Sequence, residues 1–284
     1  NMETYLSAQD YAEAAKALHT ELAGSTMHVS IIGGVVGVNG ANHVIDHCGN
    51  TGTMNGLDAM GGVVGLNEGL VTDCTLSGSM GSATQDCIGG IAGLNVGKAV
   101  SKTYGTLDYE AGTITGCVTA KDITVTGKDT VGGIVGCNIG YSDGSKTIGG
   151  TVKDNRSSAN VSGASRVGGI AGENGGTVAL SAMPQSDSRR VNGTGSGIGG
   201  VIGVNTATGQ LEASGGAAGE VIAADSKLTV QGDTKVGGIV GINRGQLGGT
   251  SISLLISAAQ VRASNGGAGG IGGAQVGTGA NTIL

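Results

Sequence analysis

The chain has 284 residues, a formal net charge of −6 and only 13% charged side chains. It therefore lacks the clustered Lys and Arg that binding to nucleic acid or to an anionic membrane surface requires. Its 60 glycines occur beside one proline without a G-X-Y period, which excludes collagen, and a hydrophobic fraction of 38% argues against disorder. Phe and Trp are absent, and no apolar run approaches the roughly 20 residues needed to span a bilayer. The small and branched aliphatics that remain suit a narrow, regular core.

The first segment, residues 1–30, predicts a helix and a lead-in. Ser7–Asp10 (SAQD) is a capping box, apolar residues at helical spacing follow it, and Gly24 is a suitable helix stop. We expect an amphipathic helix over residues 8–23 that caps the first coil, because an open sheet edge invites aggregation. The alternative is a docking helix for a partner, but four acidic residues against Lys16 disfavour a membrane surface.

From Ile31 to the end of the chain a glycine-rich phrase recurs at intervals of about 28 to 43 residues, which is the range of solenoid repeats. The copies are GGVVGVNGA from Gly33, GGVVGLNEG from Gly61, GGIAGLNVG from Gly89, GGIVGCNIG from Gly132, GGIAGENGG from Gly168, GGVIGVNTA from Gly199, GGIVGINRG from Gly237 and a degenerate GGIGGAQVG from Gly269. Segments between the copies alternate as strands do, for example DITVT at 122–126. The prediction is an all-β solenoid (β-helix) of about eight coils over residues 31–284, with the N-terminal helix before it.

Two positions of the phrase predict structural roles. The third position is always β-branched, which favours a column of buried strand residues: Val35, Val63, Ile91, Ile134, Ile170, Val201, Ile239 and Ile271. The seventh position is an amide, which favours a hydrogen-bonded ladder: Asn39, Asn67, Asn95, Asn138, Asn174, Asn205, Asn243 and Gln275. We expect the glycines to supply positive φ and room for close backbone approach.

Glycine-rich phrases also bind phosphate, but this one does not fit that chemistry. No copy is followed by the GK[ST] of a P-loop or lies between a strand and a helix, and GTGSGIG at 193–199 also lacks a following helix. The calcium-binding nonapeptide repeat needs Asp where this phrase has Asn. We expect no cofactor.

The remaining chemistry-bearing residues are sparse. Five cysteines without a CxxC pair disfavour a zinc site, leave at least one thiol free unless it pairs between chains, and favour small buried residues in the stack. His43 and His47 are too far apart on an extended chain to share one metal, so we expect exposed histidines at a coil corner. Asp108 and Glu110 could pair as in glycan-cleaving solenoids, but few aromatics are present to stack sugars.

The phrase GG[IV]xGxNxG, followed by a Cys seven residues past the Asn in the copy from Gly61, resembles the GLUG motif of bacterial surface and secreted proteins. Gly61–Leu76 (GGVVGLNEGLVTDCTL) matches it best, and the resemblance extends roughly from Ile31 to the end of the chain. GLUG arrays occur in adhesin-like cell-wall proteins and in the non-catalytic region of metallopeptidases that cleave immunoglobulin A. The resemblance implies a β-solenoid and does not by itself imply an enzyme.

Repetition without a catalytic constellation predicts a non-catalytic structural or adhesive solenoid of an extracellular bacterial surface protein or fibre. The C-terminal coil carries no polar cap, so we expect it to be open or continued, with end-to-end self-association or an extracellular host or matrix ligand as partner. The alternative is a stalk of a larger secreted enzyme such as a metallopeptidase.

Overall fold

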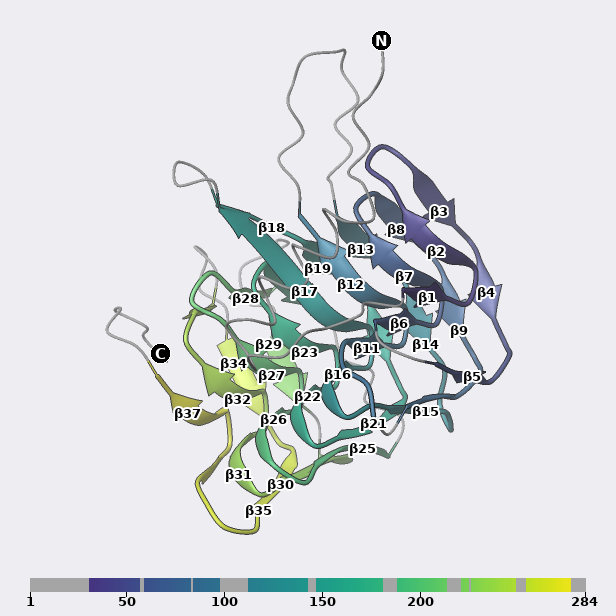
Figure 1. Cartoon of the computed structure of the whole chain (residues 1–284). Helices are drawn as coiled ribbons and strands as arrows, with labels where there is room; N and C mark the ends of the chain where they lie inside the picture. The colour runs from purple at the N-terminus through teal and green to yellow at the C-terminus, as the bar shows by residue number, and fades with distance from the viewer. Residues whose placement is uncertain are drawn as a thin grey trace. The chain divides into compact units, whose positions relative to one another are not determined.

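A computed structural model describes residues 31–56, 59–82, 84–97, 112–142, 147–180, 188–213, 221–224, 226–248 and 254–276. Within these ranges the chain forms strands and turns, with no helix, and therefore none able to span a bilayer. The strands stack in parallel sheets, as in a β-solenoid (Figure 1). The helix expected over residues 8–23 lies outside the described residues.

Five sheets are visited in turn by the chain, and we number them in that order.
Sheet 1 consists of β1 (Ile32–Gly33), β6 (Met60–Gly61), β11 (Ile88–Gly89), β16 (Asp129–Gly132), β22 (Ser165–Gly168), β26 (Ser196–Gly199), β31 (Thr234–Gly237) and β36 (Ala268–Gly269).
Sheet 2 consists of β2 (Val36–Asn39), β7 (Val64–Asn67), β12 (Ala92–Val96), β17 (Val135–Ser142), β23 (Ala171–Asn174), β27 (Ile202–Asn205), β32 (Val240–Asn243) and β37 (Gly272–Gln275), with β18 (Thr147–Gly149) antiparallel to β17.
Sheet 3 consists of β3 (Val44–Asp46), β8 (Leu70–Thr72), β13 (Thr113–Thr115), β19 (Thr151–Lys153), β24 (Thr177–Leu180), β28 (Gln210–Ala213) and β33 (Gln246–Leu247).

Sheet 4 has the fewest strands of the five and consists of β4 (Gly49–Asn50), β9 (Thr75–Leu76), β14 (Val118–Thr119) and β20 (Arg156–Ser157).
Sheet 5 consists of β5 (Met54–Asn55), β10 (Met80–Gly81), β15 (Thr124–Thr126), β21 (Asn160–Gly163), β25 (Arg189–Gly193), β30 (Leu228–Gly232) and β35 (Gln260–Ala263).
A further parallel pair joins β29 (Val221–Ala224) to β34 (Leu254–Ser257).

The repeated phrase sets the register of the stack. Its first two glycines fall at the end of a sheet 1 strand and just after it, and its amide ends the sheet 2 strand in six of the eight copies, while β12 and β17 continue past it. Gly89 pairs with Gly132 although 43 residues separate them, as directly as Gly33 pairs with Gly61 across 28. Most of the extra residues fall in the part of the sequence between β12 and β13. Spacing therefore varies without any change in which residues face the core.

The interior is a continuous apolar stack lined by inward residues of all five sheets. Six members of the expected buried column are 0% exposed: Val63, Ile91, Ile134, Ile170, Val201 and Ile239. Burying each of these side chains stabilises the fold by roughly 1.5–3 kcal/mol. Two members were predicted wrongly, because Val35 is 41% exposed and Ile271 is only partly buried. Each lies in an outermost rung, which has a described neighbouring rung on one side only.

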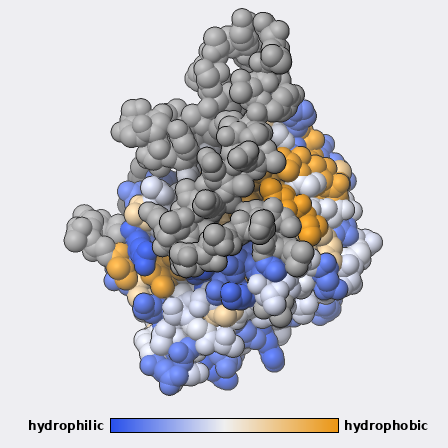
Figure 2. Space-filling model, viewed as in Figure 1, coloured by the Kyte–Doolittle hydropathy of each residue, from blue (hydrophilic) through white to orange (hydrophobic). Residues whose placement is uncertain are grey.

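The first described rung exposes further apolar side chains. Val38 is 44% exposed and Val44 is 46% exposed, and Figure 2 shows hydrophobic surface over this part of the stack. Val276, just after the last strand β37, is 42% exposed. All four large, exposed hydrophobic residues in the described part of the chain therefore lie at its two terminal rungs.

The motif glycines are required by close approach. A Cβ on Gly89 would lie 1.9 Å from the carbonyl oxygen of Ala92, and one on Gly133 would lie 2.1 Å from the carbonyl oxygen of Gly169 in the next rung. A Cβ on Gly136 would meet the backbone of Cys87 at 2.4 Å. The expectation of positive φ is wrong for the described motif glycines, none of which adopts it. Left-handed residues occur instead two positions before the motif, and most of them carry side chains: Ala59, Cys87, Thr130, Arg166, Gly197 and Lys235.

Candidate functional site

The seventh-position amides lie in one column and are joined from rung to rung. Each asparagine Nδ2 donates a hydrogen bond to the side-chain oxygen of the next amide along the stack. The bonds between two asparagines are 2.8–2.9 Å long, and the bond from Asn243 to Gln275 is 3.1 Å long. Every asparagine of the column also donates to a backbone carbonyl oxygen, as Asn138 does to Gly150 at 2.8 Å. The asparagines are at most 4% exposed. From Asn67 to Asn243 both the side-chain oxygen and Nδ2 of each asparagine are used within the stack, so these buried amides hold the rungs together.

Three cysteines form a second column, directly before sheet 4. The backbone N–H of Cys48 donates to Sγ of Cys74, and that of Cys74 donates to Sγ of Cys117, both at 3.4 Å. The backbone N–H of Cys117 donates to Oδ1 of Asn155 at 2.9 Å, which replaces a thiol in the next rung. Cys74 and Cys117 are 0% exposed, as expected for small buried residues. The hydrogen bond between the two thiols lowers the pKa of Cys74 to about 7, and that bond together with burial raises the pKa of Cys117.

Cys87 and Cys137 form a disulfide, with Cα atoms 5.4 Å apart. Sequence reasoning did not pair them, because 50 residues separate them and they occupy different positions of the motif. Cys87 is the left-handed residue before one motif copy, and Cys137 is the residue before the amide in the next copy. Only the alignment of successive copies, together with the path of the turn at Cys87, reveals their proximity.

The histidine segment lies at an exposed edge. His43 and His47 are both exposed, as the sequence predicted for a coil corner. His47 contacts the carboxylate of Asp46 through Nδ1, and this hydrogen bond raises the pKa of His47. One ligand atom from each of Asp46, His47 and Asp73 lies within 4.8 Å of the other two, so the three groups could hold a cation at the surface. All three are exposed, and surface acidic groups commonly cluster without a metal.

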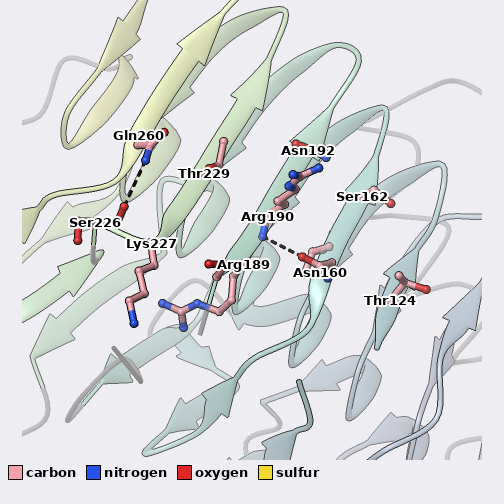
Figure 3. Close-up of a pocket in the computed structure, with 12 residues that line it drawn as sticks. Thr124, Asn160, Ser162, Arg189, Arg190, Asn192, Ser226, Lys227, Thr229 and Gln260 are labelled. Carbon is pink, nitrogen blue, oxygen red and sulfur yellow. Dashed lines mark hydrogen bonds between the residues drawn. The ribbon is translucent and has the colours of Figure 1, made fainter. Parts of the chain in front are cut away.

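Asp108 and Glu110, the carboxylates considered for glycan cleavage, lie outside the described residues. A hollow with a volume of about 740 Å³ lies elsewhere, on the outer face of sheet 5 (Figure 3). Side chains alternate along the strands of sheet 5, and Val161, Val191 and Val230 point into the core. The residues on either side of each valine in its strand therefore face outward.

Hydrogen-bonding side chains form two parallel rows on this outer face. The first row consists of Thr124, Asn160, Arg190, Thr229 and Gln260. The second row consists of Thr126, Ser162, Asn192, Gln231 and Arg262. Figure 3 shows most of these side chains projecting from neighbouring strands onto one surface.

The C-terminal part of this face is cationic. Arg190 and Arg262 are both exposed and line a hollow of about 330 Å³ with Asn192, Thr229, Gln231 and Gln260. Neither guanidinium group forms an ion pair with a described residue, since the described ion pairs involve other groups. Lys227 also lines the larger hollow, and no carboxylate is among the described residues that line either one. The arrangement presents guanidinium, amide and hydroxyl groups together, which can hydrogen bond to an anionic, hydroxyl-rich molecule.

Sequence reasoning missed this face because its residues lie between the motif copies, where no repeated phrase marks them. The alternation in DITVT pointed to a strand, but nothing showed that Thr124, Asn160 and Arg190 share one rung position. No protein-family model, no curated protein and no solved structure matches the chain.

Proposed function

We propose that this chain is a non-catalytic structural and adhesive solenoid of an extracellular bacterial surface protein or fibre, related to GLUG-repeat proteins. It consists of about eight coils behind an N-terminal capping helix and associates end to end. The observation that carries the proposal is the amide ladder, which joins every described rung from Asn39 to Gln275 through buried hydrogen bonds. Such a ladder supports a stiff scaffold, and the eight strands of sheet 1 support the coil count.

Two further observations support the location and the assembly. The Cys87–Cys137 disulfide favours an oxidising compartment, because cytosolic thiols are normally kept reduced. Exposed valines gather at the terminal rungs, where strand edges have no described partner on one side. Unpaired strand edges next to apolar side chains are templates for adding another chain.

The test is sedimentation velocity at rising protein concentration, with electron microscopy of the same samples. We expect the sedimentation coefficient to increase with concentration and Val38→Lys to reduce that increase, because a charge at the first rung opposes docking. Thr124→Lys adds the same charge to an exposed position on the side of the stack and should leave association unchanged. A monomer at every concentration, or equal effects of the two variants, would refute end-to-end association.

A further inference from the structure

We propose that the outer face of sheet 5, from β21 to β35, binds an extended acidic polysaccharide that carries carboxylates on its sugars. The inference rests on the proposed adhesive function and names its ligand. Four successive strands contribute to the site, so an elongated chain lying along the stack would contact several rungs at once.

The spacing of the two arginines suits a polymer with repeated acidic groups. β25, β30 and β35 are successive neighbours, so Arg190 and Arg262 stand two rungs apart. They also differ by two residues along the strand, since Arg190 aligns with Thr229 and Arg262 aligns with Gln231. With about 4.8 Å per rung and about 3.3 Å per residue, their Cα atoms lie roughly 12 Å apart. Two acidic sugars of one extended chain can occupy both positions, one at each arginine.

The charge of the face differs from that of the chain. The protein carries a net charge of −6, yet the charged residues lining the two hollows are Arg189, Arg190, Lys227 and Arg262, with no carboxylate among the described lining residues. Arg189 is buried and donates from Nη1 to the carbonyl oxygen of Ser157 at 3.2 Å, so we assign it a structural role. The exposed guanidinium groups of Arg190 and Arg262 are suited to bidentate hydrogen bonds with carboxylates.

The uncharged residues between the arginines favour a sugar over other polyanions. Asn192, Gln231 and Gln260 each offer both a donor and an acceptor, and Thr229 offers a hydroxyl, which together match the hydroxyl groups of a sugar. No aromatic side chain is among the described residues that line the two hollows, so these residues offer none of the stacking platforms that single-stranded nucleic acids use. Without that platform a neutral glycan would also bind poorly, and charge would have to supply the affinity.

Isothermal titration calorimetry with a polygalacturonate oligosaccharide at low ionic strength tests the site. We expect measurable binding that weakens as NaCl is added, because exposed charge pairs are screened. The double variant Arg190→Gln with Arg262→Gln should weaken binding by at least about tenfold, since two charge-assisted contacts are lost. Arg244→Gln is the matched control, because Arg244 is exposed beyond the end of β32 and lines neither hollow. Thermal melts of all variants establish that each one folds.

The inference is overturned if the wild-type protein does not bind polygalacturonate, if a neutral galactan binds equally well, or if Arg244→Gln weakens binding as much as the double variant. Stronger binding to a DNA oligonucleotide would assign the face to nucleic acid instead. Sedimentation separates this result from the proposed function. End-to-end association without polygalacturonate binding would reject the ligand and retain the scaffold, whereas binding by a strict monomer would do the reverse.

Discussion

Removing one amide from the middle of the ladder tests its energetic importance. Asn138 accepts from Nδ2 of Asn95 and donates to Oδ1 of Asn174 and to the carbonyl oxygen of Gly150, all at 2.8 Å. A fourth bond, to the carbonyl oxygen of Thr177, is longer at 3.4 Å. A typical hydrogen bond contributes about 1 kcal/mol net, and an unsatisfied buried acceptor costs about 1–3 kcal/mol. Since Asn138 is 1% exposed, Asn138→Ala should lower the free energy of unfolding by about 3–5 kcal/mol.

Urea unfolding followed by circular dichroism measures this loss. Asn265→Ala is the matched control, because Asn265 is exposed and should cost less than about 1 kcal/mol. Asn39→Ala, in the first described rung, should cost less than Asn138→Ala, because a terminal rung has a neighbour on one side only. The reasoning would be refuted if Asn138→Ala and Asn265→Ala had the same midpoint, or if the loss at Asn138 were below about 1 kcal/mol.

Three further predictions concern the core, the glycines and the thiols. Ile134→Asp places a charge at a fully buried position and should abolish the cooperative thermal transition, whereas an unchanged melting temperature would contradict the burial. Gly133→Ala should lower the melting temperature, because its Cβ would lie 2.1 Å from a carbonyl oxygen. Gly270→Ala is the control and should not lower it, because its Cβ would meet nothing within 4 Å. Equal shifts in melting temperature for the two variants would rule out the steric explanation. The pKa of Cys74 is lowered from 9.0 to about 7 in the folded protein, so its thiolate stabilises the fold fully above pH 9, and that contribution is lost as the pH falls through about 7. The raised pKa of Cys117 has the opposite effect: its stabilisation of the folded protein is complete below pH 9 and is lost as the pH rises above it. The difference in free energy of unfolding between wild type and a Cys74→Ala/Cys117→Ala variant should therefore be largest near pH 9. A difference that does not change with pH would contradict the two pKa shifts.

The interior of the stack could be predicted from the sequence because a repeated position has a repeated environment. Ile134 and Ile170 share a motif position, and both are 0% exposed. The same logic failed for Val35, because a column of similar residues does not reveal where the stack ends. Burial of a repeated residue depends on the rungs on both sides of it, and the first and last copies read like any other copy.

Contacts between different motif positions were beyond prediction. The Cys87–Cys137 disulfide joins the residue two before one motif to the sixth residue of the next. Their proximity depends on the left-handed backbone at Cys87, where φ is 55°, and on Gly136, whose missing Cβ lets the two backbones approach. Asparagine and glycine are the usual sequence signals of left-handed backbone, so a cysteine in that conformation gave no warning.

The outward residues of sheet 5 differ in length and charge from one rung to the next. In the middle of the stack the hydroxyl groups of Thr126 and Ser162 hydrogen bond to each other at 3.1 Å, so these short side chains satisfy one another. Two rungs further on, the same row holds Gln231 beside Arg262, whose longer side chains reach into solvent and are both exposed. Inward positions must stay apolar to fill the core, whereas outward positions are free to change in length and charge. The long polar and cationic side chains of the proposed binding face therefore concentrate in the C-terminal rungs of sheet 5, although the neighbouring rungs have the same backbone pairing.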